Sequence, residues 1–291
     1  SRERAYHGVN IGGTSLSGMV KNRETFSGTM PGVVHMRHTW DPKQAFTRGQ
    51  PETGADLADD LQRICENVGG STIAACFVEP IAGSTGCLVP PKGYLERLRE
   101  LCDAHGILLV FDEVITGFGR TGAPFAAQAF GVTPDLMTMA KAITNGCQPM
   151  GAIAVKDEIY ETIINAAPEN AIELFHGYTY SSHPAACAAG VADNTFAKAA
   201  GMVDYFQNAL YSLEGLDCLA DIRGYGMMGA IELKPKGNPG ALGTQFQKDL
   251  FWRGLHVKFT GDCGVVAPAF VASEADIDAM IGLLREALEE I

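Results

Sequence analysis

The chain has 291 residues, of which 46% are hydrophobic, and a formal net charge of −12. This length and composition suffice for one large domain and a smaller one, each with a buried core. The negative charge argues against nucleic acid or an anionic membrane as the main partner. The longest aliphatic and aromatic run, residues 107–111, is far too short to span a bilayer.

The eight cysteines are spread along the chain, and no two have the spacing of a metal-ligand pair. Most of them lie in apolar stretches, as expected for reduced thiols in a protein core. We therefore expect no metal site and a cytoplasmic protein without a targeting segment.

Strands and helices are predicted to alternate between residues 70 and 155. The expected strands cover residues 72–79, 107–112, 136–140 and 150–155, the last of them antiparallel to its neighbour. A helix is expected over 93–105, where Leu95, Leu98, Leu101 and Cys102 share one face, with Gly106 at its C-terminal cap. The continuous apolar run of 107–112 is typical of a strand buried on both faces of a parallel sheet. This order predicts an α/β fold with a mostly parallel, doubly wound sheet.

The later part of the chain has a different predicted order of elements. A long helix is expected over 184–215, beginning at Pro184. After Gly215, short strands at 222–233, 256–259 and 265–267 mix with helices at 240–253 and 274–291. Ser273 and the acids that follow it suit the start of the last helix. We therefore expect a large domain over 1–215 and a small α+β domain over 216–291.

Asp112 and Lys141 are the residues most indicative of chemistry. Asp112 ends the apolar strand and precedes a glycine-rich loop, and Lys141 ends the next apolar segment. Acids at the carboxyl ends of strands lie where open α/β sheets bind ligands. An acid and a near-buried lysine at neighbouring strand ends suit pyridoxal phosphate (PLP), because the lysine forms an imine and the acid pairs with the pyridine nitrogen.

Three further segments add weaker signals. Glu79 lies at another strand end and is expected to face the same crevice as Asp112. Residues 6–8, Tyr-His-Gly, bring an aromatic side chain next to a glycine, a pattern that more often reflects packing than cofactor stacking. Residues 177–183 supply hydroxyl groups and a glycine before a helix, which is a common arrangement for binding phosphate or for capping the helix.

Taken together, residues 110–122, the Lys141 segment and residues 177–181 resemble the class III PLP-dependent aminotransferases, which have fold type I. The segments at 6–10, 124–128 and 175–180 resemble most closely the ω-amino acid:pyruvate (β-alanine:pyruvate) aminotransferases. Members of this family are longer at the N-terminus. The resemblance therefore implies that a Gly-Ser phosphate-binding loop and the first elements of the large domain are absent from this sequence.

The resemblance implies a role for each matching residue. As catalytic residues, Lys141 would hold PLP and shuttle the proton, Asp112 would keep the pyridine nitrogen protonated, and Glu79 would help to position the active-site groups. The cofactor would also be bound by Tyr6 and His7, with Tyr6 stacked on one face of the ring and Val114 on the other. Thr179 would bind the cofactor phosphate of a neighbouring subunit, which implies a homodimer or a dimer of dimers.

The implied reaction is a ping-pong transfer of an amino group from an amine donor, such as β-alanine, to a keto acid acceptor, pyruvate. The sequence departs from the family at Lys258, where an arginine normally binds the substrate carboxylate. Lysine lacks the planar fork of arginine, so either the keto acid preference differs or a neighbour such as Arg253 compensates.

Two alternative interpretations stay open at this point. The first is another class III enzyme, such as a glutamate-semialdehyde aminomutase or a diamine or ornithine aminotransferase. The second is a non-catalytic fragment that lacks the N-terminal part of the cofactor cradle.

Overall fold

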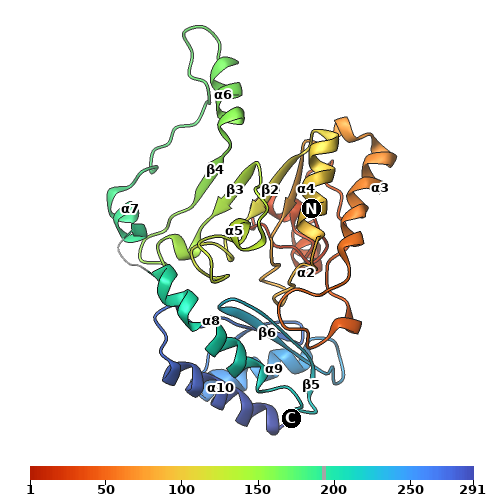
Figure 1. The fold of residues 1–291 in the computed structure, drawn as a ribbon, viewed down its shortest axis with the longest axis vertical. Helices are drawn as coiled ribbons and strands as arrows, with labels where there is room; N and C mark the ends of the chain where they lie inside the picture. Colours follow the sequence, from red (N-terminus) through yellow and green to blue (C-terminus); the bar gives the residue numbers. More distant parts are fainter. Residues whose placement is uncertain (192–194) are drawn as a thin grey trace.

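The computed structural model describes residues 1–191 and 195–291, and the strands of this part of the chain form two four-stranded sheets (Figure 1). The first sheet has the order β1-β2-β3-β4. Its strands are β1 (Ala75–Val78), β2 (Leu108–Asp112), β3 (Leu136–Met139) and β4 (Ala152–Val155). The first three run parallel, and β4 runs antiparallel to β3, as the sequence predicted.

Helices and turns surround this sheet. The α-helices of this half are α1 (Ile11–Leu16), α2 (Val20–Thr25), α3 (Asp59–Val68), α4 (Tyr94–His105), α5 (Ala126–Phe130) and α6 (Asp157–Asn165). The 3-10 turns are η1 (Pro42–Gln44), η2 (Ala55–Ala58), η3 (Gly70–Thr72) and η4 (Lys141–Ile143). Helix α4 buries the predicted apolar face, and Gly106 caps it in the left-handed conformation with a φ of 67°.

The second sheet is entirely antiparallel. It has the order β5-β6-β8-β7, with β5 (Leu219–Tyr225), β6 (Met228–Leu233), β7 (Lys258–Thr260) and β8 (Cys263–Val266). We expected one strand over 222–233, but the structure divides this range into a hairpin. Gly226 makes the turn with a φ of 58°, which a residue with a Cβ adopts only under strain.

Three longer helices accompany the second sheet: α8 (Thr195–Tyr211), α9 (Ala241–Trp252) and α10 (Glu274–Glu289). The long helix expected over 184–215 appears as α7 (Pro184–Val191) and α8, and its residues 192–194 lie outside the described part. Helix α8 packs against β5 and α10, so it lies with the second sheet. The predicted cap at Ser273 is confirmed as a capping box with Asp276.

Polar contacts join the two halves close to the ends of the parallel strands. The Thr260 hydroxyl donates to the Ser84 carbonyl oxygen at 2.9 Å, and Arg223 Nε donates to the Gly86 carbonyl oxygen at 2.8 Å. Both acceptors lie in the loop that follows β1. The end of the second sheet's strand β7 is thereby held near the edge of the first sheet.

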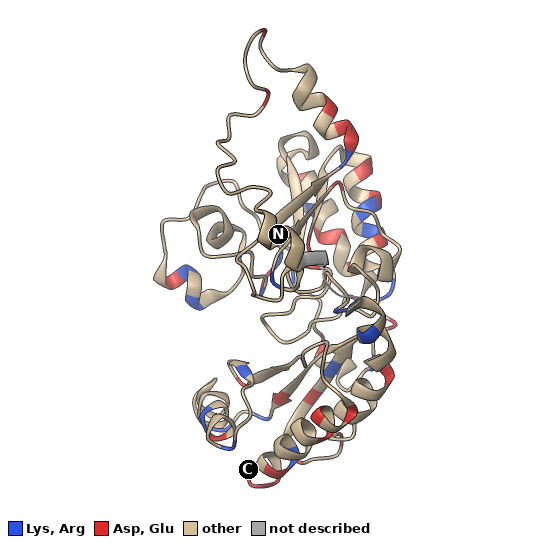
Figure 2. Ribbon diagram, turned by 90° about the vertical axis from the view of Figure 1, so that its left-hand side faces the viewer, with Lys and Arg blue, Asp and Glu red and all other residues tan. Residues whose placement is uncertain are grey.

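The helices along the right-hand edge of Figure 2 contain both acidic and basic residues. Within the described residues, no helix combines the length and the apolar character that crossing a membrane requires.

Candidate active site

Three parallel strands deliver one ionisable side chain each to the same edge of the first sheet. Glu79 follows β1, Asp112 is the last residue of β2, and Lys141 comes two residues after β3. Val78 pairs with Phe111, and Asp112 pairs with Thr138, so the strand ends are in register. These carboxyl ends are where open α/β sheets bind their ligands.

Asp112 and its neighbour Glu113 have different functions, because successive side chains of a strand point to opposite faces. Asp112 lines a cavity and is 11% exposed at its side chain. Glu113 is fully buried, and its carboxylate accepts hydrogen bonds from the backbone N–H groups of Ala126 and Ala127 at 2.7 and 2.8 Å. Glu113 therefore holds the start of α5, and only Asp112 is available to a ligand.

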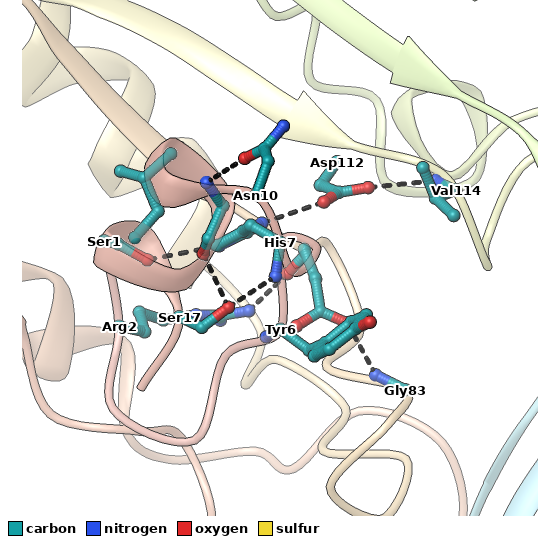
Figure 3. Close-up of polar contacts among 12 residues, drawn as sticks. Ser1, Arg2, Tyr6, His7, Asn10, Ser17, Gly83, Asp112 and Val114 are labelled. Atoms are coloured by element: carbon teal, nitrogen blue, oxygen red, sulfur yellow. Dashed lines mark hydrogen bonds and ion pairs between the residues drawn. The ribbon is translucent and has the colours of Figure 1, made fainter. Parts of the chain in front are cut away.

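Glu79 anchors two backbone segments at the cavity wall. Its Oε1 accepts the Tyr6 N–H at 2.9 Å, and its Oε2 accepts the Gly83 N–H at 3.0 Å (Figure 3). Burial raises the pKa of this carboxyl, and His7 and the two N–H groups oppose that shift. Glu79 thus faces the crevice that Asp112 faces, where it holds Tyr6 in place.

Lys141 lines the same cavity in a strained backbone conformation. Its φ is 49°, which is uncommon for a residue other than glycine and occurs mainly at functional sites. We expected a near-buried lysine, but the residue as a whole is exposed, because it borders the open cavity. Partial burial of its amine lowers the pKa of Lys141, and the charges of Asp112 and Glu79 act in the opposite direction.

The cavity has a volume of about 390 Å³, within the range of small-molecule sites. Its charged lining is Glu79, Asp112 and Lys141, and its other walls include Tyr6, Val114, Phe77 and Ile115. PLP needs an amine, an acid for its ring nitrogen and apolar surfaces for its ring, and this lining offers all three. The residues present therefore fit the cofactor that the sequence implies.

Val114 and His7 both contact Asp112. The Val114 N–H donates to Asp112 Oδ1 at 3.1 Å, and His7 Nδ1 lies 2.8 Å from Asp112 Oδ2 (Figure 3). The sequence interpretation placed His7 against the cofactor. In the structure, His7 lines the same cavity, but its side chain is only 3% exposed and is hydrogen-bonded to the acid.

Lys258 opens β7 and is exposed. Its positive charge reaches Lys141 and lowers the pKa of that amine further. Arg253, the residue considered as a compensating cation, forms an ion pair with Glu290 instead. Lys258 is therefore the cation of the second sheet that acts on Lys141.

Thr179 lies apart from this cavity in the same chain. It borders a separate depression of about 580 Å³ together with Pro149, Met150 and His176. The segment that carries it leads from α6 to α7 and extends away from the sheets (Figure 1). This segment exposes large apolar side chains, including Phe175 at 95% and Tyr180 at 87%.

Sequence reasoning missed several residues of the cavity. Phe77 and Thr138 lie inside strands β1 and β3, next to the strand ends that attracted attention. Ser17, which supports the cavity wall without lining it, was also missed, and its hydroxyl accepts the His7 N–H at 2.9 Å. Strand alternation would have placed Phe77 and Glu79 on one face, since they are two residues apart.

Comparison with known proteins places this geometry in a family. Residues 1–288 match the family described as aminotransferase class-III. The chain is 50% identical to an omega-aminotransferase of Caulobacter vibrioides over 299 residues, which cover 100% of this chain and 68% of the relative. It is 47% identical to a beta-alanine–pyruvate aminotransferase of Pseudomonas aeruginosa over 300 residues, which cover 100% of this chain and 67% of the relative.

Solved structures agree with this relationship. The omega transaminase of Pseudomonas jessenii in complex with PMP superposes with a TM-score of 0.90 at 30% identity, and the match covers 99% of this chain and 67% of that one. PMP is the aminated form of PLP, the cofactor of class III aminotransferases. The mostly parallel sheet, the strand-end acids and the lysine all agree with this family. The chain therefore belongs to the class III aminotransferases, which are PLP-dependent enzymes of fold type I.

Proposed function

We propose that this chain transfers an amino group from an ω-amino acid, such as β-alanine, to pyruvate in a ping-pong reaction with PLP as cofactor. The convergence of Asp112 and Lys141 on one cavity carries the proposal. The names of the two relatives at 50% and 47% identity support the substrate class.

PLP supplies an electron sink for the carbanion that forms at the substrate carbon. Lys141 would hold the cofactor through its amine and would then move the proton to and from that carbon. The lowered pKa of Lys141 increases the fraction of neutral amine, which is the form that reacts. Asp112 would accept a hydrogen bond from the ring nitrogen and so keep that nitrogen protonated.

Other side chains position the ring. Tyr6 and Val114, which line the same cavity, would cover its two faces. Glu79 holds the Tyr6 backbone through a hydrogen bond to its N–H. Glu79 would therefore act mainly on the orientation of the active-site groups.

Lys258 is proposed to bind the carboxylate of the keto acid. It lies close enough to Lys141 to act on that amine's pKa, and it is exposed at the start of β7. A lysine binds a carboxylate as a point charge, whereas an arginine would bind it with two parallel hydrogen bonds. We therefore expect weaker discrimination among keto acids than an arginine would provide.

We further propose a homodimer or a dimer of dimers in the cytoplasm, in which Thr179 binds the cofactor phosphate of the neighbouring subunit. The exposed apolar residues around Thr179 support a partner surface on this segment.

We propose residues 1–215 as the PLP-binding large domain and residues 216–291 as the small domain. Helix α8, which precedes this boundary in the sequence, packs on the small-domain sheet.

The test is the visible absorption spectrum of the purified chain with PLP, before and after addition of β-alanine. A Lys141→Ala variant should lose the visible band, and Lys248→Ala, which removes an exposed lysine of α9, should keep it. A band that bleaches with β-alanine and returns with pyruvate supports the proposal. A wild-type chain without the band would refute it, and turnover of glutamate semialdehyde without an added keto acid would favour the aminomutase.

A further inference from the structure

His7 lies next to Asp112 in the wall of the cavity, and the two side chains contact each other (Figure 3). Its Nδ1 is 2.8 Å from Asp112 Oδ2, and the two side chains are 3% and 11% exposed. A side chain buried to this degree offers a ligand almost no surface. The ring nitrogen of His7 that faces the site, Nδ1, therefore contacts Asp112.

Contacts from several segments fix the ring of His7. Its Nε2 lies 3.1 Å from the hydroxyl of Ser1, and its ring meets the edge of Phe77 at 6.2 Å between centroids. Its backbone N–H donates to Ser17 Oγ at 2.9 Å, and that buried hydroxyl donates to the Gly13 carbonyl oxygen at 2.7 Å. The ring therefore has little freedom to turn away from Asp112.

The hydrogen-bond geometry selects one tautomer. A carboxylate oxygen only accepts, so the His7 nitrogen that faces Asp112 must carry a proton. In the neutral ring, Nε2 then accepts the hydrogen bond of the Ser1 hydroxyl. His7 is consequently a donor to Asp112 through Nδ1–H.

Asp112 is thereby held by donors at both oxygens. Oδ1 accepts the Val114 N–H at 3.1 Å, and Oδ2 accepts the His7 ring N–H. A carboxylate offers about four lone-pair sites, so the sites left over stay open toward the cavity. Without the His7 donor, only the backbone bond to Oδ1 would remain to set the carboxylate's rotamer.

We propose that His7 is a positioning residue that acts on the cofactor through Asp112, by fixing the carboxylate in the orientation that meets the ring nitrogen. This inference rests on the proposed PLP function and deepens it. It also replaces direct cofactor contact, the role that the resemblance implied for His7. The two roles differ in a measurable way, because a residue that acts through Asp112 has no effect once Asp112 can no longer act.

A double-mutant cycle on PLP affinity distinguishes the roles. His7→Leu should weaken PLP binding about tenfold or more, the factor expected when a hydrogen bond to a charged group is lost. His7→Asn should stay within about threefold of the wild type, because its amide nitrogen can occupy the place of Nδ1. In an Asp112→Asn background, His7→Leu should change the affinity by less than about twofold. The same tenfold loss in that background would overturn the proposal.

Two controls separate this test from folding and from the proposed function. His105→Leu removes another hydrogen-bonded histidine, one paired with Gln62 through its Nε2, and should leave PLP binding unchanged. Thermal melting of each variant without cofactor reports on folding. If the wild-type chain takes up no PLP, the proposed function fails. ¹H–¹⁵N spectra of the histidine rings in the cofactor-free protein then still decide the contact, since an Nε2-protonated His7 would overturn the proposal and an Nδ1-protonated His7 would support it.

Discussion

Replacing Glu79 tests most directly whether its hydrogen bonds hold the backbone of the cavity wall in place. Its two carboxylate oxygens accept the N–H groups of Tyr6 and Gly83 at 2.9 and 3.0 Å. Glu79→Ala leaves both donors without an acceptor in a largely buried place. Glu79→Gln keeps one acceptor and turns an amide N–H₂ toward the other donor.

The expected costs follow from these contacts. A buried donor left without a partner costs about 1–3 kcal/mol, so Glu79→Ala, which leaves two such donors, should lower the free energy of unfolding by about 2–6 kcal/mol. Glu79→Gln loses one bond but also removes the cost of burying a charge, so about 1–2 kcal/mol is expected. Of the two backbone segments that Glu79 holds, only the one with Tyr6 is proposed to contact the cofactor. PLP affinity should therefore fall in both Glu79→Ala and Glu79→Gln.

Urea unfolding followed by circular dichroism measures the first effect, and PLP titration measures the second. Glu113→Gln is the matched control, because Glu113 is also a buried acid that accepts backbone N–H groups, but it does not line the cavity. It should lose stability with PLP affinity unchanged. A Glu79→Ala chain that loses less than about 1 kcal/mol would refute the role of these two bonds.

The pH dependence has a definite sign. Burial raises the pKa of Glu79 above its ordinary value of 4.5, so the folded state holds the proton more tightly than the unfolded state. The contribution of protonated Glu79 to the free energy of unfolding is fully present below pH 4.5. It is lost as the pH rises through the raised pKa of the folded state. Relative to Glu79→Gln, the wild type should therefore become less stable over that window. A flat difference between the two unfolding curves would contradict the shift.

Three further outcomes are expected. Lys258→Arg should raise kcat/KM for pyruvate about three- to tenfold with an unchanged cofactor spectrum, and an unchanged kcat/KM would argue against a carboxylate contact at this position. Ser273→Ala removes half of a capping box and should lower the free energy of unfolding by about 1 kcal/mol in urea, whereas no loss would mean that the cap contributes nothing. Gly226→Ala should cost more than about 1 kcal/mol, because its Cβ would lie 2.5 Å from the Arg120 carbonyl oxygen at a φ of 58°, and wild-type stability would show that the hairpin turn can shift.

The sheet that carries the site was predictable because each signal in it is local. The apolar run before Asp112 indicates a strand by composition alone, and the turn residues on either side bound it. Parallel strands share one edge for their carboxyl ends, so Glu79, Asp112 and Lys141 follow once the strands are known. The short connection before β4 likewise allowed its antiparallel direction to be predicted.

The contacts across that edge were not predictable. His7 and Asp112 are 105 residues apart in sequence, and nothing near either residue indicates that they pair. The exposure of Lys141 also depends on the open cavity beside it, whereas its local sequence is apolar. Arg253 was a plausible partner for a substrate by proximity to Lys258, but helix α10 brings Glu290 to it.

The arrangement of donors explains how the lysine proposed to react with the cofactor can share a cavity with two acids. Glu79 and Asp112 raise the pKa of Lys141 through space, yet within residues 1–191 and 195–291 neither forms an ion pair with it. The oxygens of Glu79 are engaged by backbone N–H groups, and those of Asp112 by Val114 and His7. A carboxylate without these donors would gain most by turning to the amine, and an amine held in a salt bridge is a poor nucleophile. The donors that hold the two acids therefore also keep Lys141 free to react.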